Sequence, residues 1–171
     1  MDGKLQPWAK AQVHVVSHSL HYGSGVFEGI RCYETPKGPA LFRVQEHVER
    51  LLASARCMLM EPPYSGAQTL DAIGATIRAN RYAACYVRPL IYRGLGFGVN
   101  PIGVPVHLAV AAWEWGAYLG KAGLEKGIRL VTSHWIKNSV ASLPTKAKVT
   151  GSYANSVLAK GEAAGLGFDE A

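Results

Sequence analysis

The sequence predicts an α+β fold, because strand-like segments flank two consecutive helix-like segments. The helix-like segments lie at 45–59 and 67–80, where apolar residues recur every three or four positions. Two strongly apolar segments at 83–92 and 105–113 favour buried strands. An apolar content of 49% and a charged content of 18% indicate a folded core rather than a disordered chain.

The segments before the first helix predict additional strands. Residues 11–17 partly alternate between polar and apolar side chains and favour a strand. Residues 29–34 and 39–43 flank the turn sequence Thr-Pro-Lys-Gly at 35–38, which predicts a β-hairpin. The first helix is expected to end at the Glu-Pro-Pro sequence at 61–63.

The remaining segments indicate a second unit. Pro89 predicts that its strand is an edge strand or carries a bulge, because proline lacks a backbone N–H. The glycine-rich segment 116–123 predicts a linker, followed by a strand at 128–133 and a helix at 151–163. We therefore expect two units joined by a linker, with the first unit at 1–116, the linker at 117–123 and a short second unit at 124–171.

Charge and cysteine content argue against several function classes. The net charge is +6, but the basic residues are scattered and do not interleave with aromatic residues, which disfavours a nucleic-acid-binding protein. Cys32, Cys57 and Cys85 are odd in number and widely spaced, which predicts neither a disulfide framework nor a zinc site. With no signal-peptide core at the start, we expect a cytoplasmic protein without membrane or nucleic-acid partners.

A glycine-rich stretch at 18–31 is the most informative local feature. Three glycines within it allow close approach of the backbone to another surface, beside Tyr22, Phe27 and Arg31. This combination is expected of a pocket wall. From spacing alone, a turn between two core strands explains it as well.

Lys148 and Arg50 are candidates for binding an aldehyde and a phosphate. A lysine whose amine is neutral can form a Schiff base, and Tyr153 five residues later could hydrogen-bond an oxygen of the same ligand. The alternative is a solvated lysine pair with Lys146. Arg50 flanks the apolar stripe of its helix, so it either binds an anion or pairs with Glu46 one turn earlier.

Tyr86 and Arg88 alternate along one strand and should therefore share one face of the sheet. With Trp115 and Tyr118 following, they could recognise a carboxylate beside an apolar wall. Packing of core and rim residues is the alternative explanation.

The order of these motifs resembles the branched-chain-amino-acid aminotransferases, which are fold-type IV pyridoxal-phosphate enzymes. The resemblance covers nearly the whole chain. It rests on five segments: HSLHYGSGVFEGIR at 18–31, FRVQEHVERL at 42–51, YVRPLI at 86–91, WGAYLG at 115–120 and the pattern Pro-Thr-x-x-Lys-x-x-Gly-x-Tyr at 144–153.

The resemblance implies a role for each candidate residue. Lys148 would hold pyridoxal 5′-phosphate covalently and move the substrate proton, Arg50 would bind its phosphate, and Tyr153 would lie beside the ring oxygen. A larger set would surround the substrate: Tyr22, Phe27, Gly29, Arg31, Tyr86, Arg88, Trp115 and Tyr118. Tyr22 matches a position that reaches into the partner subunit's site, so a homodimer or a higher homo-oligomer is expected.

The implied reaction transfers an amino group from leucine, isoleucine or valine to 2-oxoglutarate, giving glutamate. The family continues beyond residue 171, and that region carries the acidic partner of the pyridine nitrogen. The resemblance therefore implies that 1–116 is a small N-terminal domain, 117–123 an interdomain linker and 124–171 the truncated start of a large cofactor-binding domain. We expect such a truncated chain to be inactive alone. Two alternatives stay open: a D-amino-acid aminotransferase or aminodeoxychorismate lyase of the same fold, and a non-catalytic fragment that associates with another chain.

Overall fold

The computed structural model describes residues 1–116 and 120–171, which form two compact units. The first unit comprises Met1–Glu114 together with Lys146–Gly151. The second comprises Trp115–Thr145 and Ser152–Ala171. The short segment around Lys148 therefore packs with the first unit, although its neighbours in the sequence belong to the second.

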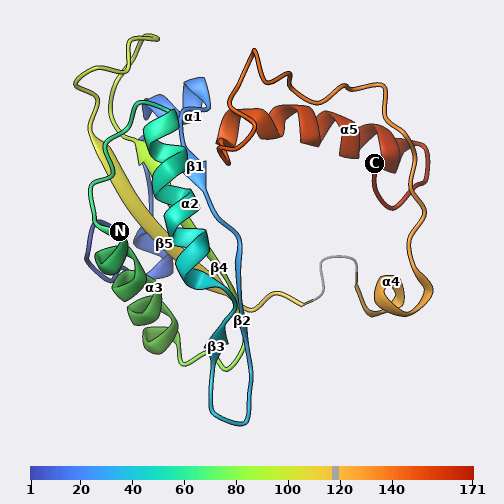
Figure 1. The fold of residues 1–171 in the computed structure, drawn as a ribbon, viewed down its shortest axis with the longest axis horizontal. Helices are drawn as coiled ribbons and strands as arrows, with labels where there is room; N and C mark the ends of the chain where they lie inside the picture. The colour runs from blue at the N-terminus through green and yellow to red at the C-terminus, as the bar shows by residue number, and fades with distance from the viewer. Residues whose placement is uncertain (117–119) are drawn as a thin grey trace. The chain divides into compact units, whose positions relative to one another are not determined.

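The first unit is an antiparallel sheet with two helices, α2 and α3, packed against it (Figure 1). This arrangement confirms the α+β class. Its elements are, in chain order, the 3₁₀ helix η1 (Trp8–Lys10), α1 (His18–Tyr22), β1 (Val26–Phe27), β2 (Ile30–Tyr33), β3 (Ala40–Leu41), α2 (Val44–Cys57), α3 (Gly66–Asn80), β4 (Cys85–Arg93) and β5 (Val106–Trp113).

Strand β4 is the centre of the sheet. It pairs with β5 along eight residues on one edge and with both β1 and β2 on the other. The expected β-hairpin is present, because β3 pairs with β2 across the 35–38 turn. β1 and β2 pair with β4 in the same register, with Val26 opposite Ile91 and Ile30 opposite Val87. They are therefore one strand that is interrupted between residues 27 and 30.

Pro89 explains the interruption. The backbone N–H of Glu28 donates to the Pro89 carbonyl at 3.0 Å, but proline has no N–H with which to return the bond. The ladder breaks at that point, and the strand resumes at Ile30. The expectation that Pro89 marks an edge strand is therefore wrong: β4 is paired on both sides, and the missing donor instead splits its neighbour.

The core lies between the sheet and the two helices. Ile30, Cys32 and Val87 project from the strands against Val48 of α2 and Ile73 of α3, and all five are buried. Helix α3 begins at a capping box in which the Ser65 and Gln68 side chains each accept a hydrogen bond from the other's backbone N–H. Both helices occupy the segments that their periodicity predicts.

Two expected strands are absent from the described residues. In 11–17, Val13 and Val15 are 49% and 67% exposed, and only Ser17 forms an isolated bridge, to Leu95. The alternation there has no sheet against which to pack. In 128–133, Leu130 makes a single isolated bridge to Glu170.

The second unit contains α4 (Gly120–Lys126) and α5 (Tyr153–Gly165), and the 3₁₀ helix η2 (Thr150–Ser152) spans the boundary between the units. Helix α4 begins within the expected linker at 116–123, and the domain boundaries proposed from the sequence stay a prediction. Among the described residues of this unit, Ala163 alone is buried. No helix in the described part of the chain has the length and apolar character needed to cross a bilayer.

Candidate functional site

The sheet presents a polar and aromatic group on the face that α2 and α3 leave uncovered. Since Ile30 and Cys32 face the helices, the alternation places Phe27, Gly29 and Arg31 on the opposite face. The register brings Tyr86 opposite Arg31, and Arg88 follows on the same face of β4.

Tyr86 and Arg88 are joined by hydrogen bonds. The Arg88 guanidinium donates to the Tyr86 hydroxyl from Nε at 3.2 Å and from a terminal nitrogen at 2.7 Å. Gly29 makes room for this pair: a Cβ at that position would lie 2.3 Å from the Tyr86 hydroxyl oxygen. Glycine is therefore required at position 29, because the Tyr86 side chain passes directly over it.

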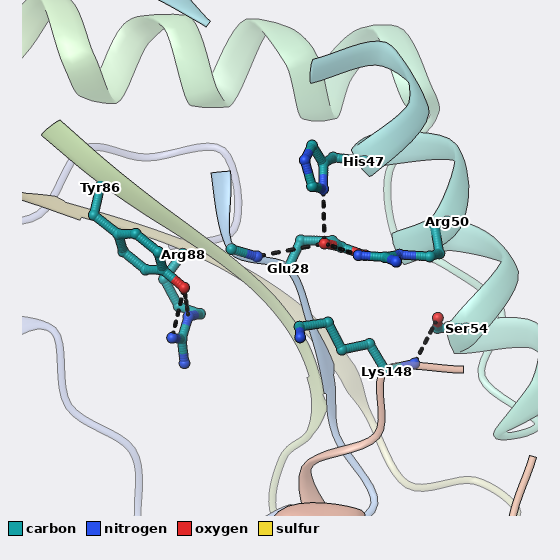
Figure 2. A network of polar contacts seen from close by, with 8 residues as sticks. Glu28, His47, Arg50, Ser54, Tyr86, Arg88 and Lys148 are labelled. Atoms are coloured by element: carbon teal, nitrogen blue, oxygen red, sulfur yellow. Dashed lines mark hydrogen bonds and ion pairs between the residues drawn. The ribbon is translucent and has the colours of Figure 1, made fainter. Parts of the chain in front are cut away.

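The segment that carries Lys148 lies along the free edge of β1. The N–H of Phe27 donates to the Lys148 carbonyl at 3.1 Å. The N–H of Lys148 donates to Ser54 Oγ of α2 at 3.1 Å, as Figure 2 shows. Two residues later, the Thr150 N–H donates to the Gly25 carbonyl at 2.8 Å. The segment 146–151, which carries Lys148 and is called the lysine segment below, therefore packs against the glycine-rich stretch.

Close packing at Gly23 depends on the absence of a side chain. Its φ is +60°, and a Cβ there would lie 2.6 Å from the Cα of Gly151. The Gly151 N–H donates to the Gly23 carbonyl at 3.0 Å. Gly23 and Gly151 therefore allow the two backbones to approach each other at this point.

The Lys148 amine lies at the uncovered face. Its Nζ is 4.9 Å from the centre of the Phe27 ring, and the Arg88 guanidinium carbon is 4.5 Å from the same ring. Both are within the range of a cation–π contact. An amine from the Lys148 segment and a guanidinium from β4 therefore meet at one aromatic ring, and the guanidinium also binds the Tyr86 phenol.

Glu28 projects from the interruption toward α2 and is fully buried. Its carboxylate accepts hydrogen bonds from Arg50 Nε at 2.5 Å, from an Arg50 terminal nitrogen at 2.7 Å and from His47 Nδ1 at 2.8 Å (Figure 2). Burial alone would raise the pKa of Glu28, but the hydrogen bonds and charges of Arg50 and His47 outweigh it and lower the pKa. Arg50 does not pair with Glu46, which instead binds Arg43.

The remaining candidates belong partly to the first unit and partly to the second. Tyr22 is on α1, where its hydroxyl accepts from the Gly98 N–H at 2.9 Å and its ring packs on Phe97. Tyr153 begins α5 in the second unit, and Lys137 Nζ lies 5.5 Å from its ring centre. Trp115 also belongs to the second unit and is 39% exposed, whereas Tyr118 lies outside the described residues.

Sequence reasoning missed His47, Ser54 and the carboxylate role of Glu28. His47, Arg50 and Ser54 are three and four positions apart, so they share one side of α2. That spacing was visible in the sequence, but it did not identify Glu28 as their strand partner. Within the part of the chain that the structure describes, no group of three metal-ligating side chains is assembled.

Comparisons with known proteins agree with this architecture. Residues 25–171 match the family model for class IV amino-transferases. Branched-chain-amino-acid aminotransferases of Pseudomonas aeruginosa and Escherichia coli K12 are 46% and 43% identical over 171 residues. The alignments cover 99% of this chain but 56% and 55% of those proteins. The chain therefore spans about half the length of the curated relatives it matches.

Solved structures show the same likeness. The branched-chain amino acid aminotransferase of Escherichia coli superposes with a TM-score of 0.95 at 43% identity, covering 98% of this chain and 56% of that one. Another branched-chain amino acid aminotransferase, from the organism abbreviated T.th. and complexed with N-(5′-phosphopyridoxyl)-L-glutamate, gives a TM-score of 0.92 at 47% identity and covers 99% and 55%. The described fold is therefore found within longer enzymes.

Proposed function

Because the chain belongs to the class IV aminotransferase family, we propose that it forms part of a branched-chain L-amino-acid aminotransferase. The reaction is transfer of an amino group from leucine, isoleucine or valine to 2-oxoglutarate, with pyridoxal 5′-phosphate as cofactor. Relatives named for this activity, and a solved relative complexed with a phosphopyridoxyl derivative of glutamate, support the proposal.

The position of Lys148 carries the proposal. Its backbone is fixed by Phe27 and Ser54, while its amine extends to the face of the sheet that α2 and α3 leave uncovered. The residues present fit the cofactor chemically: a primary amine for its aldehyde, a guanidinium for its phosphate, and an aromatic ring beside the amine.

Each residue has a proposed task. Pyridoxal phosphate, when bound, supplies an electron sink that stabilises negative charge at the substrate Cα. Lys148 binds the cofactor and moves the Cα proton, Arg50 binds the phosphate, and Tyr153 orients the ring oxygen. The apolar ring of Phe27 would accommodate a branched side chain.

The uncovered face also offers groups for carboxylates. Arg31 lies beside the Tyr86–Arg88 pair, so a second carboxylate, such as that of glutamate, would find cationic and hydroxyl donors there. We propose the remaining substrate-side roles for Tyr22, Gly29, Trp115 and Tyr118. A site that accepts both an apolar side chain and a carboxylate is what the two halves of this transamination require.

Reductive trapping tests the lysine assignment. The 171-residue chain is incubated with pyridoxal phosphate, reduced with borohydride, digested and mapped by mass spectrometry. We expect the modification at Lys148, its loss in Lys148→Ala and its retention in the matched variant Lys146→Ala. Equal labelling of both lysines, or labelling unaffected by Lys148→Ala, would contradict the assignment.

A substrate panel tests the reaction. We expect weak cofactor binding and negligible transamination by this chain alone, and turnover of L-leucine with 2-oxoglutarate when a segment covering the rest of the relatives' length is supplied. Preference for D-alanine would favour a D-amino-acid aminotransferase, and release of pyruvate from aminodeoxychorismate would favour the lyase. Absence of every activity in the complemented chain would leave the non-catalytic fragment as the better description.

We also propose a cytoplasmic homodimer. Large apolar side chains are exposed at Leu20 of α1, by 63%, and at Phe97 and Val99, by 77% and 82%. The Phe97 ring packs on Tyr22 of α1, and exposed apolar groups that gather in this way are typical of interaction surfaces. The three cysteines are free, as expected in a reducing compartment. Size-exclusion chromatography with light scattering tests the dimer, and a monomeric complemented protein would contradict it.

A further inference from the structure

A fully buried carboxylate is costly unless it is paired, so the position of Glu28 requires an explanation. It lies where Pro89 interrupts the sheet, and its side chain points to α2 rather than to the uncovered face. A glutamine or an apolar residue could occupy the same strand position. The groups that Glu28 binds must therefore explain why a charged residue occupies this position.

Glu28 binds Arg50 through two parallel hydrogen bonds. Arg50 Nε meets one carboxylate oxygen, and an Arg50 terminal nitrogen meets the other. This bidentate geometry fixes the plane of the guanidinium as well as its distance. His47, one turn earlier on α2, donates to the carboxylate oxygen that the terminal nitrogen of Arg50 binds, and so orients the carboxylate itself.

Arg50 is only partly covered, since 51% of its side chain is exposed although its partner is fully buried. A free arginine side chain at a helix surface samples many rotamers and loses that conformational freedom when a ligand fixes it. The buried carboxylate holds the guanidinium before any ligand arrives. The pair Arg43–Glu46 at the start of the same helix lacks this feature, because its side chains are 63% and 50% exposed.

We propose that Glu28 is a positioning residue that orients the Arg50 guanidinium for the phosphate of the cofactor. This role rests on the proposed function, since it requires that Arg50 binds that phosphate. A merely structural role, in which Glu28 only attaches α2 to the sheet, predicts a general loss of stability and no dependence on the phosphate of the ligand.

The test compares two ligands that differ in one group. Pyridoxal 5′-phosphate and pyridoxal are each titrated into the full 171-residue chain and followed by absorbance. Glu28→Gln keeps the shape of the side chain but removes the charge and one acceptor. We expect it to weaken binding of the phosphate ester about tenfold and to leave pyridoxal binding unchanged. The matched control Glu46→Gln should change neither.

A ligand-free readout accompanies the titration. The Nε–Hε resonance of Arg50, assigned with the variant Arg50→Lys, should be protected from exchange in the unsubstituted chain and lose that protection in Glu28→Gln. In the Arg50→Lys background, Glu28→Gln should cause no further loss of phosphate-ester binding, because the two residues act as one unit. If Glu28→Gln does not fold, Glu28→Asp, which retracts the carboxylate by one methylene, carries the same expectations.

The outcomes separate the two proposals. If the unsubstituted chain binds pyridoxal phosphate no better than pyridoxal, the phosphate role of Arg50 is contradicted, and the positioning role falls with it. If the chain prefers the phosphate ester but Glu28→Gln weakens both ligands equally, the positioning role alone is overturned. A tenfold loss confined to the phosphate ester supports both.

Discussion

The two units of this chain both contain large apolar side chains, but they bury them to very different extents. In the first unit Leu51, Ile73 and Val87 are fully buried between the helices and the sheet. In the second unit Ile136 and Val157 are 88% and 69% exposed. The difference shows that apolar side chains form a core only where two layers, such as a sheet and its helices, pack against each other.

This contrast predicts where the stability of the chain resides. The first unit has the two-layer arrangement and the paired sheet, and the lysine segment 146–151 is hydrogen-bonded to it. The candidate site around Phe27 is therefore built on the stable unit. Substitutions should affect stability according to the unit in which they lie.

The largest expected effect comes from removing a core side chain. Leu51→Ala should reduce the free energy of unfolding by about 2–5 kcal/mol, because Leu51 is fully buried and its removal leaves a cavity. The same substitution at Leu158 of α5, which is 47% exposed, should change it by less than about 0.5 kcal/mol. Denaturant unfolding followed by circular dichroism measures both, and similar losses at the two leucines would remove the contrast.

A smaller effect is expected where the lysine segment meets the glycine-rich stretch. Gly103→Ala, at φ +78° in open space, should cost about 1 kcal/mol for the left-handed backbone alone. Gly23→Ala has a similar φ of +60° but also places a Cβ 2.6 Å from Gly151, which adds about 1–3 kcal/mol of overpacking. Equal losses of unfolding free energy in the two variants would show that the lysine segment does not pack against Gly23.

The pH dependence of stability provides a third and smaller effect. The pKa of Glu28 is lowered in the folded chain, so its contribution is present above the unfolded pKa and is lost as the pH falls through the folded pKa. Unfolding free energies measured between about pH 6 and pH 3 should therefore decline less steeply in Glu28→Gln than in the unsubstituted chain.

Glu162 of the second unit is the comparison for this measurement. Hydrogen bonds from Ser133 and His134 lower its pKa as well, but the His134 side chain is 91% exposed, so solvent screens this ion pair. Glu162→Gln should leave the pH dependence of global unfolding nearly unchanged. An equal flattening of the curve by both substitutions would show that burial of Glu28 does not set the effect.

Local patterns predicted the parts of the fold that local physics determines. The apolar stripes of α2 and α3, the hairpin turn at 35–38 and the shared face of Tyr86 and Arg88 all follow from periodicity or turn chemistry. The alternation at 11–17 failed because a strand also needs a neighbour, and that segment has only one isolated bridge.

The parts of the site that could not be predicted depend on contacts between distant residues. Arg50 was expected either to bind an anion or to pair with Glu46 on its own helix, but a carboxylate from the interrupted strand, Glu28, is its partner. Similarly, nothing local indicates that the Lys148 segment lies along β1. Motif order suggested that these residues serve one site, whereas only the fold shows the hydrogen bonds that join them.

Hydrogen exchange tests the central claim most directly, namely that the lysine segment is an integral part of the first unit. The backbone N–H groups of Phe27, Thr150 and Gly151 should exchange as slowly as those of β4, because each is bonded between β1 or the glycine-rich stretch and the segment 148–151. The N–H groups of residues 154–165 in α5 should exchange much faster. Fast exchange at Phe27 and Thr150 together with slow exchange in β4 would contradict the account.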